Sequence, residues 1–167
     1  LNSNITVQDF KNEFVAYASA TISSRLRSFQ FRFLHRITLT NVFAHKIGLI
    51  EDPSCTFCGN EAETMMHLFW NCTYVQIFWH RVFQFTQSEY GLHTVLNNKN
   101  ALLSCDINLL NLLCICAKQY IYFCKTVKKR PSIVEYVQRV QNLRSIEQAI
   151  AEKNNKMHYF NRKWQGL

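Results

Sequence analysis

Apolar residues recur along this chain at spacings of three and four, the period of amphipathic α-helices. The first such stretch covers residues 22–37, and its apolar face holds Leu26, Phe29, Phe33 and Ile37. On a helical wheel of about 100° per residue, three arginines lie together on one flank of this face: Arg25, Arg32 and Arg36. The pattern predicts a helix with one buried face and one basic flank.

A second, shorter helix is expected next. Thr40 is a suitable amino-terminal cap because its hydroxyl can accept a backbone N–H, and Gly48 suits the left-handed position that ends a helix. We expect the buried face of this helix to hold Val42, Phe43 and Ile47.

Longer helical patterns follow. One covers residues 73–85, after which polar residues and a glycine predict an exposed linker over residues 87–100. Asp106 is a suitable cap for an apolar helix that reaches Val127, and the basic residues 128–130 favour the carboxyl end of the helix dipole there.

Two amphipathic patterns complete the chain. After a turn at Pro131, six apolar residues recur on the expected buried side of a new helix: Ile133, Val137, Val140, Leu143, Ile146 and Ile150. In the tail, Met157, Phe160 and Trp164 stand at helical spacing. The chain is 48% apolar and has only 4 Gly and 2 Pro in 167 residues. This composition favours a mainly α fold over a sandwich, a barrel or a disordered chain.

Four residues of the kinds that bind zinc follow one another as Cys-x2-Cys-x8-His-x4-Cys: Cys55, Cys58, His67 and Cys72. Structural zinc takes four thiolate or imidazole ligands in a tetrahedron, and a Cys-x2-Cys loop supplies two of them. The pattern predicts one Zn²⁺ knuckle, in which four ligands leave no open position for catalysis. The alternative is that the cysteines pack as small apolar side chains and the histidine makes a polar contact in the core.

The spacing of the last two ligands constrains the backbone. On one unbroken α-helix, residues five positions apart point about 140° away from each other. His67 and Cys72 can therefore share a metal only if the helix breaks between them. We expect the break at Asn71, which is a poor helix-interior residue.

The remaining cysteines have no such pattern. They lack a neighbouring histidine, and we expect them to pack in the core: Cys105, Cys114, Cys116 and Cys124. Seven cysteines are an odd number without the regular spacing of a secreted disulfide framework, which favours a reducing compartment. The apolar run 109–124 is too short to span a bilayer, so no membrane partner is expected.

Charge is unevenly distributed. The formal net charge is +8, which favours an acidic partner such as nucleic acid. Residues 51–100 hold five acidic against two basic residues, whereas residues 1–50 and 101–167 are both basic. Three thiolates and a neutral imidazole around Zn²⁺ add one more negative charge to the knuckle. Phosphate attraction dominates nucleic-acid affinity, so the knuckle is expected to fix the fold and the flanking helices to bind.

Two groups of residues are candidates for that contact. The basic candidates are Arg25, Arg32, Arg36, Lys118, Lys125, Lys128, Lys129 and Arg130. The candidates for stacking on unpaired bases are an exposed Phe57 and, beside basic residues, His35, Tyr159 or Trp164; the alternative for these aromatic residues is packing in the core. The alternative for each basic group is a solvated helix face.

The residues between Arg27 and Arg81 carry a family resemblance. The motifs are Phe-Gln-Phe-Arg-Phe-Leu-His-Arg-Ile (29–37), Lys46-Ile47-Gly48, Cys55-Thr-Phe-Cys58, Glu63-Thr64, His67-Leu-Phe-Trp70, Cys72 and Phe78-Trp79. This stretch resembles the zinc-binding region that follows the reverse transcriptase in the second protein of LINE-type non-LTR retrotransposons. The segment 160–164 is similar to the carboxyl end of the same proteins.

The resemblance implies a non-catalytic carboxyl-terminal domain that binds the template RNA, and target DNA as a second ligand, in target-primed reverse transcription. It implies the reverse transcriptase domain of the same parent protein as a partner, and a place in a cytoplasmic ribonucleoprotein and in the nucleus. The parent would be an RNA-directed DNA polymerase with an endonuclease. No Tyr-x-Asp-Asp polymerase motif occurs here, so we expect no enzyme activity in this chain itself.

The expected organisation is a helical region with the zinc knuckle (1–86), a linker (87–104) and a basic helical carboxyl-terminal bundle that packs on the first region (105–167). The alternative function is a protein-interaction domain. In that case zinc only joins helices, and the acidic knuckle and the apolar helix 107–127 dock on the polymerase domain.

Overall fold

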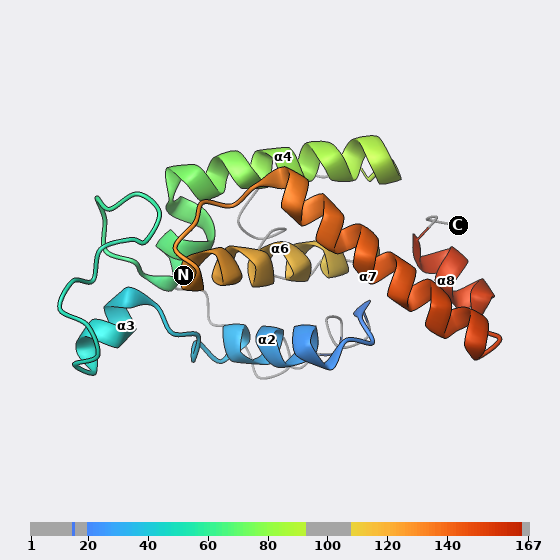
Figure 1. Cartoon of the computed structure of the whole chain (residues 1–167), viewed down its shortest axis with the longest axis horizontal. Coiled ribbons are helices and arrows are strands. Elements are labelled where there is room, and N and C mark those ends of the chain that lie inside the picture. The colour runs from blue at the N-terminus through green and yellow to red at the C-terminus, as the bar shows by residue number, and fades with distance from the viewer. Residues whose placement is uncertain (1–14, 16–19, 93–107, 165–167) are drawn as a thin grey trace.

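The computed structural model describes residues 15, 20–92 and 108–164 (Figure 1). Within these ranges the chain is helical and forms no strand, apart from an isolated antiparallel bridge between Ser54 and Ala62. The elements are α2 (Ser24–Leu34), α3 (Asn41–Lys46), the π-helical turn η1 (His67–Asn71), α4 (Thr73–Tyr90), α6 (Asn108–Thr126), α7 (Ile133–Lys153) and α8 (Met157–Trp164). The expected mainly α fold is confirmed.

Helix α6 is the centre of the fold. Figure 1 shows it between α2 and α4, with α7 crossing beside it and α8 packed on the far end of α7. Most positions of α6 are buried, so it is apolar on nearly all sides, as expected of a helix enclosed by its own chain. In the alternative function this helix docks on the polymerase domain, but α6 is covered by the other helices of this chain.

Helix α2 matches the predicted pattern except at its end. Leu26, Phe29 and Phe33 are buried, and the Ser23 hydroxyl caps the helix by accepting the N–H of Leu26. Ile37, however, is 55% exposed. The helix ends at Leu34 before Ile37 can reach the core, and Arg36 then takes the left-handed conformation with φ 57°.

Helix α3 begins and ends where predicted but buries a different face. The Thr40 hydroxyl accepts the N–H of Phe43 at 3.3 Å, and Gly48 has φ 72°. Phe43 and Ile47 are 44% and 51% exposed, whereas Ala44 is buried, so the predicted buried face is wrong. Helix α3 has only six residues, which make fewer than two turns. Its first turn is joined to the loop of the first two cysteines by a hydrogen bond from the N–H of Val42 to the backbone carbonyl of Glu63.

Helix α4 is longer than predicted. It continues to Tyr90 and ends at Gly91, which has φ 64°, so the first residues of the expected linker are helical. Their polar side chains lie on the solvent side while Tyr90 packs against Trp164 at a ring-centre distance of 6.2 Å. The rest of the linker and Asp106 lie outside the described residues.

Helix α7 buries the predicted face except at its carboxyl end: Val140 is buried, and Ile133, Val137 and Leu143 pack against the core. Ile146 and Ile150 are 58% and 42% exposed, whereas Glu147 and Ala151 are buried. The face is set by α8, whose Lys163 and Trp164 donate to the Glu147 carboxylate. The tail residues at helical spacing do form a helix, and Phe160 and Trp164 are buried at 7% and 2% exposure, so Trp164 presents no face to a base.

Most of the buried apolar residues form one continuous core, which reaches from α2 to α8 and includes Leu26 and Trp164. The domain boundaries 1–86, 87–104 and 105–167 stay a prediction, although α6 does pack on α2 and α4. None of the described helices combines the length and apolar character needed to cross a membrane.

Candidate metal centre and basic face

The four predicted zinc ligands converge. One ligand atom from each residue lies within 4.8 Å of all the others: Cys55, Cys58, His67 and Cys72. The Sγ atoms of Cys55 and Cys72 are 3.9 Å apart, and Cys58 Sγ is 3.3 Å from His67 Nε2. Around a tetrahedral Zn²⁺, two thiolates stand about 3.8 Å apart and a thiolate and an imidazole nitrogen about 3.6 Å apart. The donor set and its spacing therefore fit zinc.

A short hairpin-like loop supplies the first two ligands. Its two sides are joined by the Ser54–Ala62 bridge and by the N–H of Cys55, which donates to the carbonyl of Glu61 at 2.8 Å. The turn between them closes at Gly59, which has φ 70° and whose N–H donates to the carbonyl of Cys55 at 2.8 Å. The loop thus presents both thiols from one tight turn.

The π-helical turn η1 supplies the other two ligands. The N–H of Cys72 donates to the carbonyl of His67 at 3.0 Å, an i to i+5 bond that widens the helix by one residue. The chain then leaves helical geometry at Cys72, which has φ −59° and ψ 129°, one residue after the expected break at Asn71. Trp79 on α4 donates its indole N–H to the Phe69 carbonyl at 2.8 Å, which satisfies a buried backbone acceptor of the widened turn.

The free nitrogen of the histidine ligand faces a carboxylate. Glu61 Oε2 lies 3.2 Å from His67 Nδ1, although the ring N–H is not aligned with it for a regular hydrogen bond. A carboxylate in this position favours the tautomer that presents Nε2 to the metal. The Thr64 hydroxyl also accepts the backbone N–H of His67 at 3.0 Å, which fixes the start of this helical turn.

The three thiols differ in acidity. Burial raises the pKa of Cys55 to about 12 and also raises the pKa of Cys72. Burial acts on Cys58 as well, but hydrogen bonds from the backbone N–H groups of Asn60 and Glu61 help to lower its pKa to about 7. Cys58 is therefore the thiol most readily available as a thiolate, and the other two must lose their protons when a metal binds.

Glu63 joins the knuckle to two helices, a role that the sequence did not predict. Its carboxylate is fully buried and accepts the N–H of Asn41 at 3.0 Å and the N–H of Thr56 at 2.9 Å. The ammonium of Lys125 on α6 lies 3.2 Å from the same carboxylate and donates to the Asn41 amide oxygen at 2.9 Å. One buried charge pair thus connects α3, the loop and α6.

The other described cysteines lie away from this centre. Cys114 and Cys124 are buried in α6 and Cys116 is partly buried, as expected for core packing, while Cys105 is outside the described residues. Burial raises the pKa of Cys116 to about 12 and raises that of Cys124, so both stay protonated at neutral pH.

Comparison with known protein families also assigns zinc binding to the region that contains the four candidate ligands. Residues 4–79 match the family described as zinc-binding in reverse transcriptase. This range contains all four candidate ligands, and with their clustering it supports a zinc domain linked to reverse transcriptases. The match ends within α4 and does not extend to α6, α7 and α8. No curated protein and no solved structure matched the chain.

Two predicted nucleic-acid contacts are buried, which contradicts their expected exposure. Phe57 is 5% exposed because the loop between the first two cysteines folds against the core. Lys118 is fully buried on α6, and its ammonium lies 4.6 Å from the centre of the Phe33 ring. Neither side chain presents a surface to phosphate or to a base.

Three further basic candidates already have partners in the chain. Lys125 pairs with Glu63, as described above, and Lys129 pairs with Glu135 on α7. The Arg130 guanidinium is exposed, but it lies 3.8 Å from the centre of the Tyr74 ring. The pairing of Lys125 and Lys129 neutralises two of the basic residues expected at the α6 carboxyl end, and Lys128 and Arg130 stay exposed.

The predicted basic flank of α2 is open to solvent. Arg25 and Arg32 are exposed on α2, His35 and Arg36 are exposed just past its end, and Lys128 is exposed past the end of α6. Their role in binding stays a prediction.

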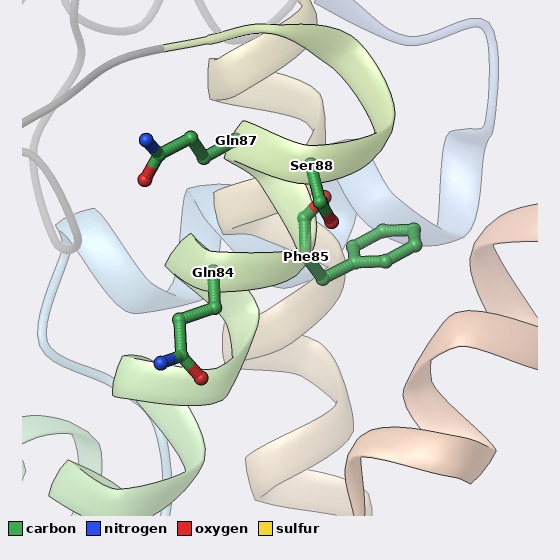
Figure 2. A pocket seen from close by; sticks show the side chains of 4 residues that line it. All are labelled: Gln84, Phe85, Gln87 and Ser88. Atoms are coloured by element: carbon green, nitrogen blue, oxygen red, sulfur yellow. The ribbon is translucent and has the colours of Figure 1, made fainter.

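The surface of the described residues has a hollow on α4 and another between α2 and α6. Figure 2 shows one on α4, lined by Gln84, Phe85, Gln87 and Ser88; the Phe85 ring and the two glutamine side chains project from different sides of the helix. Polar groups that do not converge give no basis for a small-molecule site. The other hollow, named here the α2–α6 groove, has a volume of about 200 Å³ and is lined by Arg25, Phe29, Arg32, Gln119, Tyr122, Phe123 and Thr126.

Proposed function

We propose that this chain is the non-catalytic zinc domain of a LINE-type retrotransposon reverse transcriptase. In this proposal it binds nucleic acid, chiefly the template RNA, and positions template and primer for a polymerase elsewhere in the parent protein. The family match to residues 4–79 and the clustered ligands support the zinc domain. The net charge of +8 supports an acidic partner.

The observation that carries the binding proposal is the exposed arginine pair of α2. Arg25 and Arg32 stand two helical turns apart on one face, directly beside a hollow. The knuckle offers a surface of the opposite charge, since Glu51, Asp52 and Glu61 are all exposed there. In this arrangement zinc fixes the loop and α4, and α2 makes the phosphate contacts.

Charge reversal on α2 tests this proposal. Replacing Arg25, Arg32 and Arg36 by Glu is expected to lower affinity for single-stranded RNA and to flatten its salt dependence, because each phosphate contact adds about −0.7 to the slope of log K against log salt. A matched control reverses three basic residues at the other end of the molecule: Lys153, Lys156 and Arg162. Equal losses in both triple variants would show that only net charge matters and would contradict a binding face on α2.

A second function is favoured by one specific observation. Six large apolar residues around α3 are exposed by 37–64%: Ile37, Leu39, Phe43, Ile47, Leu49 and Ile50. Apolar groups gathered in one region of a surface mark interaction sites. In the alternative function, the chain is a protein-interaction domain that binds the polymerase domain of the parent. The surface that docks there would be this α3 patch and not α6.

The two functions are separable by experiment. Replacing Phe43 and Ile47 by Ser is expected to abolish association with the reverse transcriptase domain if the α3 patch docks there, and to leave RNA affinity unchanged. Isothermal titration calorimetry of the arginine variant and of the α3 variant, each with RNA and with the reverse transcriptase domain, shows which surface binds which ligand. Tight binding of the polymerase domain without any RNA binding would favour the alternative over the leading proposal.

A further inference from the structure

The α2–α6 groove is built from two facing stripes of residues. Arg25, Phe29 and Arg32 follow one another at i, i+4 and i+7 on α2, and four residues of α6 stand at i, i+3, i+4 and i+7 opposite them: Gln119, Tyr122, Phe123 and Thr126. Helices α2 and α6 pack directly on each other, so the stripes are the two walls of one slot. The slot has cations on one wall and aromatic rings with polar groups on the other.

The floor and the aromatic wall are fixed by packing. Phe29 is 2% exposed and lies beneath Tyr122, with the ring centres 6.0 Å apart. Tyr122 is only partly buried and lines the slot. The ring of Phe123 already has two cations of the chain against it, since the Arg139 guanidinium lies 4.3 Å and the Lys129 ammonium 5.6 Å from its centre. Tyr122 is therefore the ring best placed to receive a flat ligand.

The size of the slot sets the size of the ligand. Its volume of about 200 Å³ is below the roughly 300–1,000 Å³ of pockets for drug-sized molecules. A single planar ring system is of the right scale. The Gln119 side chain adds an amide donor and acceptor to the lining, and the Thr126 hydroxyl adds another polar group, which are the groups that read the edge of a nucleobase.

We propose that the α2–α6 groove binds one unpaired base of single-stranded RNA, stacked on Tyr122, while Arg25 and Arg32 contact the flanking phosphates. The inference rests on the proposed function, because it names the ligand of the same basic face. A base inside a duplex is already stacked and cannot enter a slot between two helices, so only an unpaired base gains from it. Single-strand preference thus follows from the aromatic wall, whereas overall affinity follows from the arginines.

The test compares Tyr122→Leu with Tyr159→Leu in the zinc-loaded full chain. Leu keeps apolar bulk against Phe29 but removes the aromatic face, and Tyr159 is a 54% exposed tyrosine beside Arg162 on α8, which makes it a matched control. The probes are a fluorescent single-stranded RNA, a blunt RNA duplex of the same length, and a single strand of abasic nucleotides. Anisotropy titrations at two salt concentrations give affinity and salt slope.

Tyr122→Leu is expected to weaken binding of the single-stranded RNA by roughly tenfold, since base stacking contributes about 1–3 kcal/mol. Affinity for the duplex and the abasic strand, and the salt slope of all three probes, should stay unchanged because no charge is removed. Tyr159→Leu should match the wild type. An unaffected single-strand affinity in Tyr122→Leu, or an equal loss on the duplex, overturns the inference.

Crosslinking keeps the inference testable if Tyr122→Leu does not fold. Irradiation of the wild-type protein with 4-thiouridine RNA is expected to give an adduct on the peptide that contains Tyr122, and adducts confined to other peptides overturn the inference. Failure of the proposed function looks different: the wild-type protein would then bind none of the three probes. If the wild-type protein binds RNA and Tyr122→Leu binds it equally well, only the stacking site is rejected and the proposed function is not.

Discussion

A buried glutamate joins neighbouring elements at each end of the molecule, yet within the described ranges a cluster of candidate metal ligands occurs at one end only. At the knuckle, Glu63 accepts two backbone N–H groups and pairs with Lys125 of α6. At the other end, Glu147 of α7 accepts both the Lys163 ammonium and the Trp164 indole N–H of α8. At both ends, therefore, an ion pair between a glutamate and a lysine joins neighbouring elements of the fold.

The surroundings of the two glutamates differ. Around Glu147, α7 and α8 are regular helices, and the buried rings of Phe160 and Trp164 supply apolar contacts. Around Glu63, the chain is mostly loop, and Leu49 and Ile50 are exposed. A buried ion pair seldom stabilises a fold by itself, because desolvation offsets the attraction. The comparison predicts that the α7/α8 end keeps its structure without a metal, whereas the loop and α3 at the knuckle end depend on one.

Removing the metal is expected to have the largest effect. Structural zinc binding contributes apparent free energies of about 10–16 kcal/mol in zinc-finger peptides, and the loop that carries the first two ligands contains no helix of its own. Chelation, or Cys72→Ala, should expose the backbone of α3 and the loop to hydrogen exchange while α7 and α8 stay protected. Mass spectrometry of the exchanged peptides measures this difference directly.

Cys124→Ala is the control for this prediction, since Cys124 is equally buried but lies outside the metal centre. It should leave zinc content at one ion per chain. Loss of protection spread evenly over both ends after chelation would show that zinc supports the whole fold and would remove the contrast between them.

Neutralising each glutamate should have the next largest effect. Glu63→Gln and Glu147→Gln each leave a lysine without its carboxylate, which costs about 3–5 kcal/mol when the pair is buried. Lys163 is more exposed than Lys125, at 19% against 12%, so the loss in Glu147→Gln should fall at the lower end of this range.

Zinc affinity separates the two glutamate variants. Glu63→Gln should weaken zinc binding, because it loosens the loop that holds Cys55 and Cys58, and Glu147→Gln should not. Urea unfolding gives the free energies and a competition titration with a chelating dye gives the affinities. If the two variants changed zinc affinity equally, the knuckle and the α7/α8 end would have to be one cooperative unit.

The smallest expected effect comes from a pair of glycines. Gly59 and Gly91 have φ 70° and 64°, and a Cβ added at either would meet no atom within 4 Å. Alanine should therefore cost only the left-handed backbone conformation, roughly 1–2 kcal/mol.

Only Gly59→Ala is expected to weaken zinc binding, by roughly 5- to 30-fold, because its cost falls within the loop of the first two ligands. Gly91→Ala, at the end of α4, should lower the free energy of unfolding alone. Chelator competition on both variants checks this, and weaker zinc binding in Gly91→Ala would contradict the local origin of the effect.

The sequence predicted the local features well. Thr40 and Gly48 bound α3, the apolar face of α2 is the buried one, and the spacing of the four ligands required an interruption after His67. Each of these depends on residues that are close together in the chain. Caps, periods and metal-ligand spacings are local patterns, so they can be read without knowing the tertiary structure.

The same sequence did not predict which charges are buried. Lys118 and Lys125 were interpreted as a basic surface, but both stand in a helix that is apolar on nearly all sides. Such a lysine signals a buried partner, and the partner of Lys125, Glu63, lies in a distant loop. On α7, likewise, the apolar period favoured Ile146, whereas the carboxylate of Glu147 determined the buried face. Long-range pairing decided both cases.

The widened turn between His67 and Cys72 bears on how such sites tolerate insertions and deletions. On a regular α-helix, residues four apart already share a face, so a His-x3-Cys spacing would place both ligands together without a π-helical turn. The i to i+5 bond of Cys72 to His67 absorbs one extra residue locally and keeps α4 in register with the core. A relative one residue shorter here would lose the bulge and keep the site. Two ligand spacings that a sequence search treats as distinct motifs can therefore encode one and the same metal centre.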